Sequence, residues 1–450
     1  MSKVIKGLAL GMMAVMPCSL ALADTASEIA DLRRRLDMLE QKQAAESAQI
    51  EAKTDTLAKE IDRTKLGQIL PEKAELKSEW GLGPAASSVY GVKQGLSIGG
   101  YGEGQYRAFV DDANGKKDNA DLLRVITYLG YKFDENIIFN SEIEFEHATT
   151  GGIGGDSGEE EGEVSVEFAY LDFLMNEAAN ARVGLVLVPM GFINEIHEPP
   201  YFHGVRRPEV EQVIIPSTWR ENGFGLFGAF DAAGKVEYRT YLVNGLRASR
   251  FKASGIRSGR QNGNRALFED VAWTTRIDYL PEAIPGFLAG GSWWLGNSGQ
   301  DETFAGEEPS VFTILGEAHA QYRRDLLELR VLGSWGHIDD ADLLSAAAGE
   351  TIGEDFYGWY AEAAYNVLPH FMPESTHYLA PFVRFEQLDT QSGVPSGFAK
   401  DESQDKDVYT VGLTYKPHPD VALKLDYRNF QTEGNRKTAD EVALGFGFAF

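Results

Sequence analysis

The last ten residues of the chain, Glu441–Phe450, read E-V-A-L-G-F-G-F-A-F. A β-strand turns successive side chains to opposite faces of its sheet. The large apolar set is Val442, Leu444, Phe446, Phe448 and Phe450, and the small set is Ala443, Gly445, Gly447 and Ala449. The stretch therefore predicts a strand with hydrocarbon on one face and a crowded interior on the other. A strand of a soluble β-sandwich could share this pattern, but it would seldom end a chain on a bare aromatic residue.

This ending resembles the C-terminal signature of bacterial outer-membrane β-barrels, which have a terminal Phe and a second aromatic residue two positions earlier. The signature usually carries a polar residue upstream, where this chain has Ala443. The resemblance implies that the outer-membrane assembly machinery reads this strand, with Phe446, Phe448 and Phe450 as the assembly signal.

The composition fits a barrel and argues against one class of partner. Charged residues make up 24% of the chain and hydrophobic residues 43%, as in an ordinary soluble protein. A transmembrane barrel has a similar composition, because only alternate residues of its strands meet lipid. The 48 glycines and the aromatic content of 11% favour β-structure with tight bends. The net charge of -26 argues against nucleic acid as a partner, because phosphate binding needs clustered Lys and Arg.

Residues 1–23 are predicted to be a signal peptide. Lys3 and Lys6 supply the positive start, Gly7–Met16 the apolar core, and Ala21–Ala23 the small-residue cleavage site. The single cysteine lies within this peptide, so the mature chain is expected to have no disulfide. Beyond it, no run reaches the roughly 18 apolar residues of a membrane helix. An exported chain of this kind is periplasmic, secreted or a barrel.

Residues 24–66 have a helical pattern that predicts a short coiled coil. Leu32, Leu36 and Leu39 follow the heptad spacing among charged neighbours. The alternative is a single amphipathic helix docked on the rest of the chain. Glycine, proline and serine are scattered through residues 67–94, which are predicted to be a linker.

Residues 95–450 lack a helical period and alternate instead in segments typical of strands. The predicted strands are 96–109, 121–133, 137–147, 164–175, 181–189, 222–230, 235–244, 268–280, 286–296, 310–323, 325–337, 355–367, 377–388, 407–416, 420–430 and 440–450. Sixteen is an even number, as single-chain bacterial barrels require.

The connections between these strands alternate in length. Every second one is mostly short, such as Asp134–Glu135 and Pro417–Pro419, and the others are longer, such as Thr150–Gly162 and Gly245–Ala266. Short periplasmic turns opposite long extracellular loops are the expected asymmetry of an outer-membrane barrel, and a sandwich has no reason for it. The predicted fold class is therefore all-β: a sixteen-stranded antiparallel transmembrane β-barrel with an N-terminal helical coiled-coil segment.

One long connection, Met190–Arg220, differs from the others because it is rich in large apolar residues. Exposed loops elsewhere are rich in Gly, Asp and Ser. An apolar loop of about thirty residues in a compact domain is usually functional. Its side chains need a surface to pack against, and the inner wall of the barrel is available. We expect this loop to fold into the lumen and to narrow it.

The same stretch resembles the phosphate-selective porin O/P family. The resemblance rests on G-F-I-N-E-I-H-E-P-P-Y-F-H-G-V-R-R and I-I-P-S-T-W-R-E-N-G-F-G, within residues 183–228. It implies a homotrimeric sixteen-strand porin in the outer membrane of a Gram-negative bacterium, with outer-membrane lipid around it. It also implies a water-filled channel for small polar solutes, constricted by the third extracellular loop, between strands five and six.

The family's phosphate preference does not follow, because an anion filter needs rings or ladders of Lys and Arg. On the loop, the candidate constriction residues are Glu195, His197, Glu198, Tyr201, His203, Arg206, Arg207, Glu209, Glu211 and Arg220. On the wall, the candidate pore-lining residues are Arg107, Arg124, Glu142, Glu144, Arg276, Glu328, Arg330, Arg384, Lys424 and Arg428. Positive and negative side chains together favour the passage of small polar or zwitterionic solutes. Phosphate and other anions stay as alternative solutes. The alternative is that several of these ions only hold the loop against the wall.

Four other interpretations have weaker support. His197 and His203 lie six residues apart on a proline-containing loop and lack the spacing of a helical metal pair, so no metal and no cofactor are expected. Gly99–Gly104 reads G-G-Y-G-E-G, but no helix follows it, as a nucleotide loop would need. A barrel hydrolase would need a base beside a nucleophile such as Ser217. The fourth is a structural anchor whose coiled coil grips the cell wall while the barrel is plugged.

Overall fold

The computed structural model describes residues 21–64, 76–110, 115–148, 162–434 and 438–450. The chain divides after Leu70 into two compact units. The first contains the helix α1 (Ala21–Thr64), and the second contains the strands. Residues 1–20 of the predicted signal peptide lie outside the described residues, and Ala21–Ala23 begin α1.

The helix α1 covers nearly all of the segment predicted to form a coiled coil. Its apolar residues Leu36, Leu39 and Ile50 are exposed within the single chain. The helical part of the prediction is confirmed, and association through this stripe stays a prediction. Among the described helices, none has the length and apolar character needed to span a membrane.

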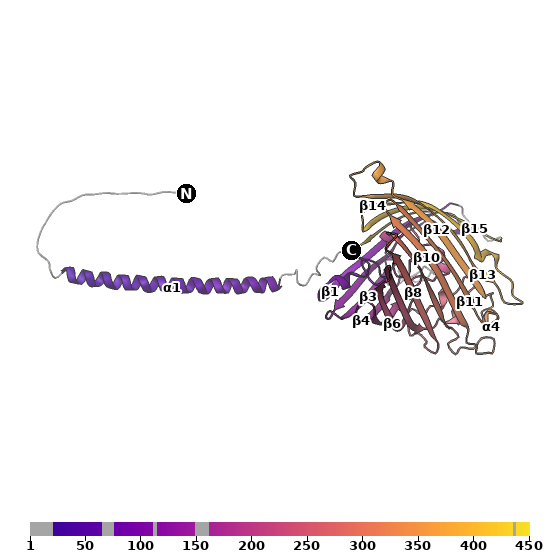
Figure 1. Cartoon of the computed structure of the whole chain (residues 1–450), viewed down its shortest axis with the longest axis horizontal. Coiled ribbons are helices and arrows are strands. Elements are labelled where there is room, and N and C mark those ends of the chain that lie inside the picture. Colours follow the sequence, from indigo (N-terminus) through magenta and orange to yellow (C-terminus); the bar gives the residue numbers. More distant parts are fainter. Residues whose placement is uncertain (1–20, 65–75, 111–114, 149–161, 435–437) are drawn as a thin grey trace. The chain divides into compact units, whose positions relative to one another are not determined.

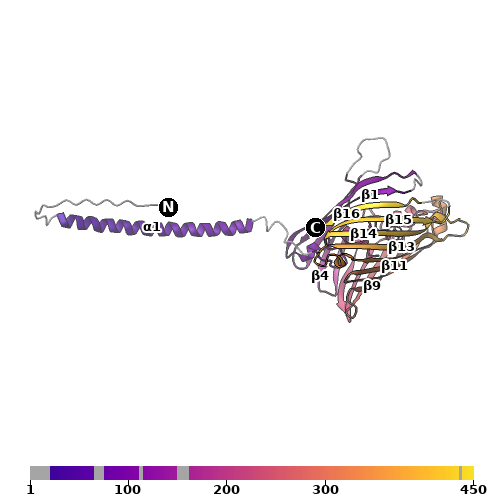
Figure 2. The ribbon, with the colours of Figure 1, turned by 90° about the horizontal axis from the view of Figure 1, so that it is seen from above.

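The second unit is a closed antiparallel barrel in which each strand pairs with the next and β16 pairs with β1. Figure 1 shows the long tilted strands, and Figure 2 shows β13 to β16 lying in sequence order beside β1. The strands are β1 (Gly95–Phe109), β2 (Asn119–Lys132), β3 (Ile137–Glu146), β4 (Val164–Leu174), β5 (Asn180–Leu187), β6 (Arg220–Asp231), β7 (Gly234–Asn244), β8 (Val271–Pro281), β9 (Phe287–Asn297), β10 (Phe312–Arg324), β11 (Leu327–Ile338), β12 (Asp355–Tyr365), β13 (Tyr378–Gly393), β14 (Asp405–His418), β15 (Val421–Thr432) and β16 (Glu441–Ala449). All sixteen predicted strands are confirmed.

Short helices lie in the connections and before β1. They are α2 (Ser88–Gly91), η3 (Pro199–Tyr201), α3 (Val210–Val213), η4 (Ala248–Arg250), η5 (Arg257–Gly259), α4 (Ala341–Ala348), η6 (Leu368–His370) and η7 (Glu402–Gln404). Two of them, η3 and α3, belong to the loop between β5 and β6 that the sequence singles out.

The two faces of the strands differ as the alternation predicts. On β15, Leu423, Leu425 and Tyr427 are exposed, whereas Lys424 and Asp426 are buried inside. The same holds on β11, where Leu329, Val331 and Trp335 are exposed. An exposed apolar exterior on a closed sheet without edges is what a bilayer requires of a spanning β-structure.

The barrel closes where aromatic rings of β16 lie over glycines of β1. The rings of Phe446, Phe448 and Phe450 cover Gly104, Gly102 and Gly100, respectively. A Cβ atom on Gly102 would lie 2.8 Å from Cζ of Phe448, so a larger residue there would displace the ring. The G-G-Y-G-E-G run thus makes room for the terminal aromatic residues.

On the inner side of the same strand, the small residues make room for the loop. A Cβ atom on Gly445 would lie 2.8 Å from Cγ1 of Val205, and one on Gly447 would collide with Pro199. The small face that the sequence shows at its C-terminus is therefore the surface against which the β5–β6 loop packs.

Removing Phe450 is expected to lower the yield of folded barrel severalfold while export stays normal. Its backbone N–H donates to the Gly100 carbonyl, and its carbonyl accepts from the Gly100 N–H, both at 2.9 Å. The deletion removes this closing pair together with the ring over Gly100. The folded fraction can be measured by heat-modifiable migration on gels. Phe145→Ala, at an exposed outer position of β3, is the matched control. Normal insertion of the truncated chain would contradict this prediction.

The segment before β1 differs from the expected linker. Residues 82–87 are buried, as are Val89 and Val92. The Ala86 carbonyl accepts from Asn140 Nδ2 on β3 at 2.8 Å, and the Tyr90 hydroxyl donates to Asp172 on β4 at 2.6 Å. Both partners are buried on the inner wall. Residues 82–92 therefore lie largely inside the barrel, and residues 67–75 of the predicted linker lie outside the described residues.

Candidate pore interior

The loop between β5 and β6, residues 188–219, lies against the inner wall along its whole length. Its apolar side chains Ile193, Val210, Ile214 and Trp219 are buried. The Trp219 ring contacts the buried Trp294 of β9, with ring centroids 5.5 Å apart. Arg220, which the sequence places at the end of this loop, is the first residue of β6. We call residues 188–219 the inner loop.

Asn194 joins the two ends of the inner loop, where Val188 and Trp219 lie side by side; we call this point the neck of the loop. Its side-chain amide donates to the carbonyl of Val188 at 2.6 Å and to that of Trp219 at 2.9 Å. Its Oδ1 accepts from the Trp219 backbone N–H at 2.6 Å. The Trp219 carbonyl also accepts from the Val188 N–H at 3.0 Å, so one buried side chain and one backbone hydrogen bond join the two ends of the loop.

Glu211 joins the middle of the loop to β12. Its carboxylate accepts from the Ile193 N–H at 2.7 Å and from the Tyr360 hydroxyl at 2.6 Å. Burial raises the pKa of Glu211, and these two donors oppose the rise because they stabilise the charged form.

A cluster of opposite charges fixes the loop to β7 and β8. Glu195 lies 3.0 Å from the Arg239 guanidinium and 3.7 Å from that of Arg276. Arg239 and Arg276 also share Asp278, at 2.6 and 2.8 Å. All four side chains are buried, so each charge depends on its partners.

A second cluster fixes the other end of the loop to the wall. Arg428 on β15 pairs with Glu209 of the loop at 2.9 Å and with Glu441 of β16 at 3.1 Å. Arg384 on β13 pairs with Glu362 and Glu386, each at 3.0 Å. The loop's Val205 and Val210 donate backbone N–H groups to Asp426 and Glu386.

Glu198 links the inner loop to the segment before β1. Its Oε1 accepts from the backbone N–H groups of Ala85 and Ala86, each at 3.1 Å. Burial raises the pKa of Glu198 to about 8, although both N–H groups favour the charged form. The two segments therefore hold each other within the lumen.

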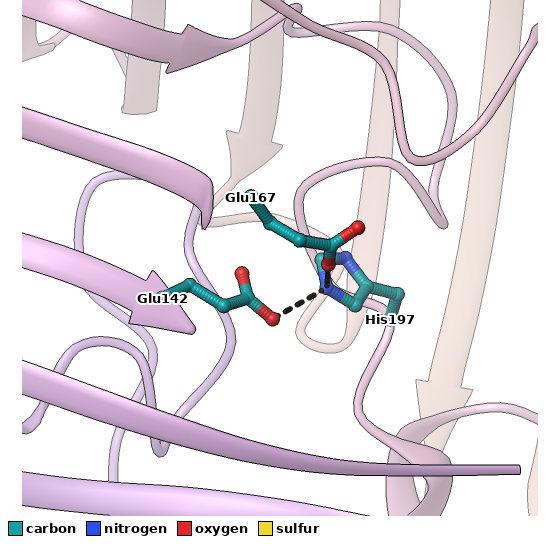
Figure 3. A group of neighbouring side chains, drawn as sticks. All are labelled: Glu142, Glu167 and His197. Carbon is teal, nitrogen blue, oxygen red and sulfur yellow. Dashed lines mark hydrogen bonds and ion pairs between the residues drawn. The ribbon is translucent and has the colours of Figure 1, made fainter. Parts of the chain in front are cut away.

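His197 lies between two carboxylates of the wall, as Figure 3 shows. Its Nε2 is 3.1 Å from Glu142 Oε1 on β3 and 3.3 Å from Glu167 Oε2 on β4. Burial lowers the pKa of His197, but the two carboxylates outweigh it and raise the pKa to about 10. Glu167 also accepts from Arg220 at 3.0 Å.

The other loop histidine, His203, lies elsewhere. Its Nδ1 is 3.0 Å from the Thr414 hydroxyl, and its Nε2 is 3.6 Å from Glu328. The structure does not bring His197 and His203 together, nor does it place Glu195 or Glu198 beside either imidazole in an ion pair. Instead, each of these four residues has a different partner on the wall or in the segment before β1.

A cavity of about 320 Å³ lies beside the loop, towards the short turns. Both Trp80, from the segment before β1, and Tyr201, from the inner loop, line it. Its charged lining residues are Glu195, Glu237, Arg239, Arg276, Asp278, Arg323 and Arg330. Because both signs of charge face this space, it suits a polar occupant and does not present a purely basic surface.

The predicted wall residues largely face the interior, and most are ion-paired. Arg124, for example, pairs with Glu103 and Glu144 at 2.9 Å each. Arg107 is less enclosed and lies near the Asn119 side chain. The prediction missed Glu167 and Arg239, which sit on the inward parity of β4 and β7. The alternation of inward and outward residues along these two strands would have identified both as inward-facing. The roles of these residues in conduction stay predictions.

The Glu209–Arg428 pair predicts a pH dependence. Burial raises the pKa of Glu209, but Arg428 and Arg206 outweigh it and lower the pKa to about 2. A lowered pKa adds stability that is fully present above about pH 4.5 and is lost as pH falls towards 2. We expect the wild-type barrel to lose about 3 kcal/mol from this pair over that interval. Glu209→Gln should lack this part of the pH dependence in urea unfolding; an identical pH profile would contradict the pairing.

Comparison with known proteins gives one close relative. The chain is 41% identical over 379 residues to an uncharacterized protein of Aquifex aeolicus (strain VF5), covering 81% of this chain and 82% of that protein. The chain belongs to the family of this protein. No model of a known protein family matches the chain, so the resemblance to the phosphate-selective porin O/P family stays a prediction.

Solved structures show the same fold at low sequence identity. One is the outer membrane channel DcaP of Acinetobacter baumannii, 13% identical, with a TM-score of 0.51 over 79% of this chain and 97% of that one. Another is OmpF of Salmonella typhi in complex with daunomycin, 12% identical, with a TM-score of 0.50 over 80% of this chain and 98% of that one. The barrel is therefore porin-like in fold.

Proposed function

We propose that this protein is an outer-membrane porin of a Gram-negative bacterium, through which small polar or charged solutes diffuse passively. The observation that carries the proposal is the contrast between the two faces of the closed barrel. Its exterior is exposed and apolar, whereas its interior carries buried charges around a polar cavity of about 320 Å³. The porin-like fold supports the same reading.

The charges around the cavity bear on the class of solute. Arginines and carboxylates lie on adjacent strands, as with Arg239 on β7 and Asp278 on β8 beside Glu195 of the loop. Opposed charges across a narrow passage set up a field that orients dipolar solutes. The solute class proposed is therefore small, polar and zwitterionic or singly charged, with phosphate and other anions as candidates to be compared.

Recording from planar lipid bilayers tests this function. Stable current steps are expected, smaller than those of an unobstructed sixteen-strand barrel, because the inner loop and residues 82–92 pack against the inner wall and would narrow the passage. Reversal potentials in asymmetric salts of chloride, phosphate and zwitterionic buffers would then rank the solutes. A folded barrel that carries no current at any voltage would overturn the proposal.

A plugged barrel is the second candidate, and one observation favours it. Residues 82–87 and most of the inner loop are buried together inside the barrel. In that case the barrel would anchor an N-terminal helix to the membrane and would conduct only after residues 82–92 are removed. Current from the intact chain distinguishes the porin from the plug.

An enzymatic role has less support. His203 lies between Thr414 and Glu328, an order that resembles a nucleophile, a base and an orienting acid. However, Thr414 is fully buried, so a substrate could not reach its hydroxyl. Ser217, the other hydroxyl considered, is also buried, and its Oγ lacks a hydrogen-bond partner among the described residues.

We further propose that three copies of the chain associate. The exposed apolar residues of α1, including Leu36, Leu39 and Ile50, supply a stripe that another copy could cover. Native mass spectrometry of the detergent-solubilised protein should give three chains per particle, and a monomeric mass would contradict this assembly.

A further inference from the structure

The geometry around His197 points to a binding site for a divalent transition-metal ion, which we propose is held by His197, Glu142 and Glu167. The three side chains come from the inner loop, β3 and β4, and their nearest ligand atoms all lie within 4.8 Å of one another. Figure 3 shows the imidazole facing the two carboxylates. The ion would hold the inner loop against β3 and β4, and its binding does not depend on whether solutes pass through the barrel.

The hydrogen bond on the far side of the ring defines which nitrogen is available. His197 Nδ1 lies 3.1 Å from the backbone carbonyl of Asn194. A carbonyl oxygen can only accept, so Nδ1 carries the proton. In a neutral imidazole, Nε2 then has its lone pair directed towards Glu142 and Glu167. A protonated partner nitrogen bonded to a backbone carbonyl is the usual outer contact of a metal-bound histidine.

The distances between ligand atoms match those around a small ion. Nε2 is 3.1 Å from Glu142 Oε1 and 3.3 Å from Glu167 Oε2. Metal–ligand bonds of about 2.0–2.1 Å in a tetrahedron place ligand atoms about 3.3–3.4 Å apart. One imidazole and two carboxylates provide three of the four positions, and the set suits Zn²⁺, Co²⁺ or Mn²⁺ better than a soft ion.

Two buried carboxylate oxygen atoms supply a second argument for a cation at this position. Glu142 Oε2 and Glu167 Oε2 are buried and accept no well-aligned hydrogen bond among the described residues, although Glu167 Oε2 lies 3.3 Å from His197 Nε2. Both side chains are fully buried. A buried carboxylate oxygen without a donor is costly, and Arg220 together with the single imidazolium N–H leaves the Oε2 atoms of both carboxylates poorly satisfied. A divalent ion would neutralise the two carboxylates together.

The position of the site suggests what the ion would do. It would join the first third of the inner loop to β3 and β4, directly beside Asn194 at the neck of the loop. The two arginine clusters already hold the loop to β7, β8, β13 and β15. A metal at His197 would complete the ring of attachments and fix the loop in a single position.

Cobalt is the probe for this site, because four-coordinate Co²⁺ absorbs visible light strongly. The chain is unfolded in urea with a chelator, refolded into detergent with excess Co²⁺, and freed of unbound ion. We expect about one Co²⁺ per folded chain and a tetrahedral absorption band that Zn²⁺ abolishes. His197→Gln and Glu167→Gln should each weaken Co²⁺ binding at least about 100-fold.

The matched control is another histidine between two carboxylates. His337 lies 2.8 Å from Asp355 and 3.1 Å from Asp339 at a more exposed position. His337→Gln should leave Co²⁺ uptake unchanged. Wild-type protein that folds in excess Co²⁺ without taking it up would overturn the inference and leave an ion pair only. The same holds if His197→Gln binds as the wild type does. If the protein binds Co²⁺ but conducts no current, the proposed porin function is contradicted and the metal site is still supported.

Discussion

Deleting Ile193–Val213 is expected to raise the single-channel conductance severalfold. This part of the inner loop is held to β3, β4, β7, β8, β13 and β15, and its removal would vacate most of the space that the loop fills. The charges it leaves behind, including Arg239 and Arg428, would face water in the widened lumen. Conductance should therefore rise, and selectivity should shift towards anions, because arginines lose their loop carboxylates.

The experiment needs a control for the loss of residues in general. Deleting Gly115–Lys117 removes exposed residues of the connection between β1 and β2. Its conductance should match that of the wild type. Heat-modifiable migration on gels would show that both deletion variants contain folded barrels. If the inner-loop deletion folds and its conductance is unchanged, the loop does not limit the current, and the constriction assigned to it is wrong.

The strands could be predicted because their signal is local. Alternation on each segment and the short turns every second connection are properties of neighbouring residues, and they gave all sixteen strands with small shifts at their ends. The inner loop could also be recognised, because residues such as Ile214 and Trp219 are too apolar for an exposed connection. Their burial in the structure follows directly from that composition.

The partners of the loop could not be predicted in the same way. Glu142 and Glu167 meet His197 because β3, β4 and the loop converge, and no spacing in the sequence records that meeting. The burial of residues 82–87 could not be predicted for a related reason. Glycine, proline and serine indicate irregular backbone, but they do not indicate whether it lies inside or outside. The apolar Leu82, Val89 and Val92 were the signal that the segment is buried.

Arg428→Met should destabilise the barrel by about 3–5 kcal/mol, the usual cost of removing one partner from a buried ion pair. The Arg428 side chain is completely buried and pairs with Glu209 and Glu441. Methionine has a similar length but supplies no charge, so two carboxylates would remain with fewer donors. Urea unfolding followed by tryptophan fluorescence measures the loss.

Two further variants separate the lost charge from the lost packing. Arg323→Met removes an arginine that pairs with Glu328 but is 45% exposed, so it should cost less than about 1 kcal/mol. Adding Glu209→Gln and Glu441→Gln to Arg428→Met should restore part of the stability, because the unpaired charges are then gone. If Arg428→Met costs no more than Arg323→Met, the buried network does not hold the loop. The loop would then depend on its apolar contacts and on the neck formed by Asn194.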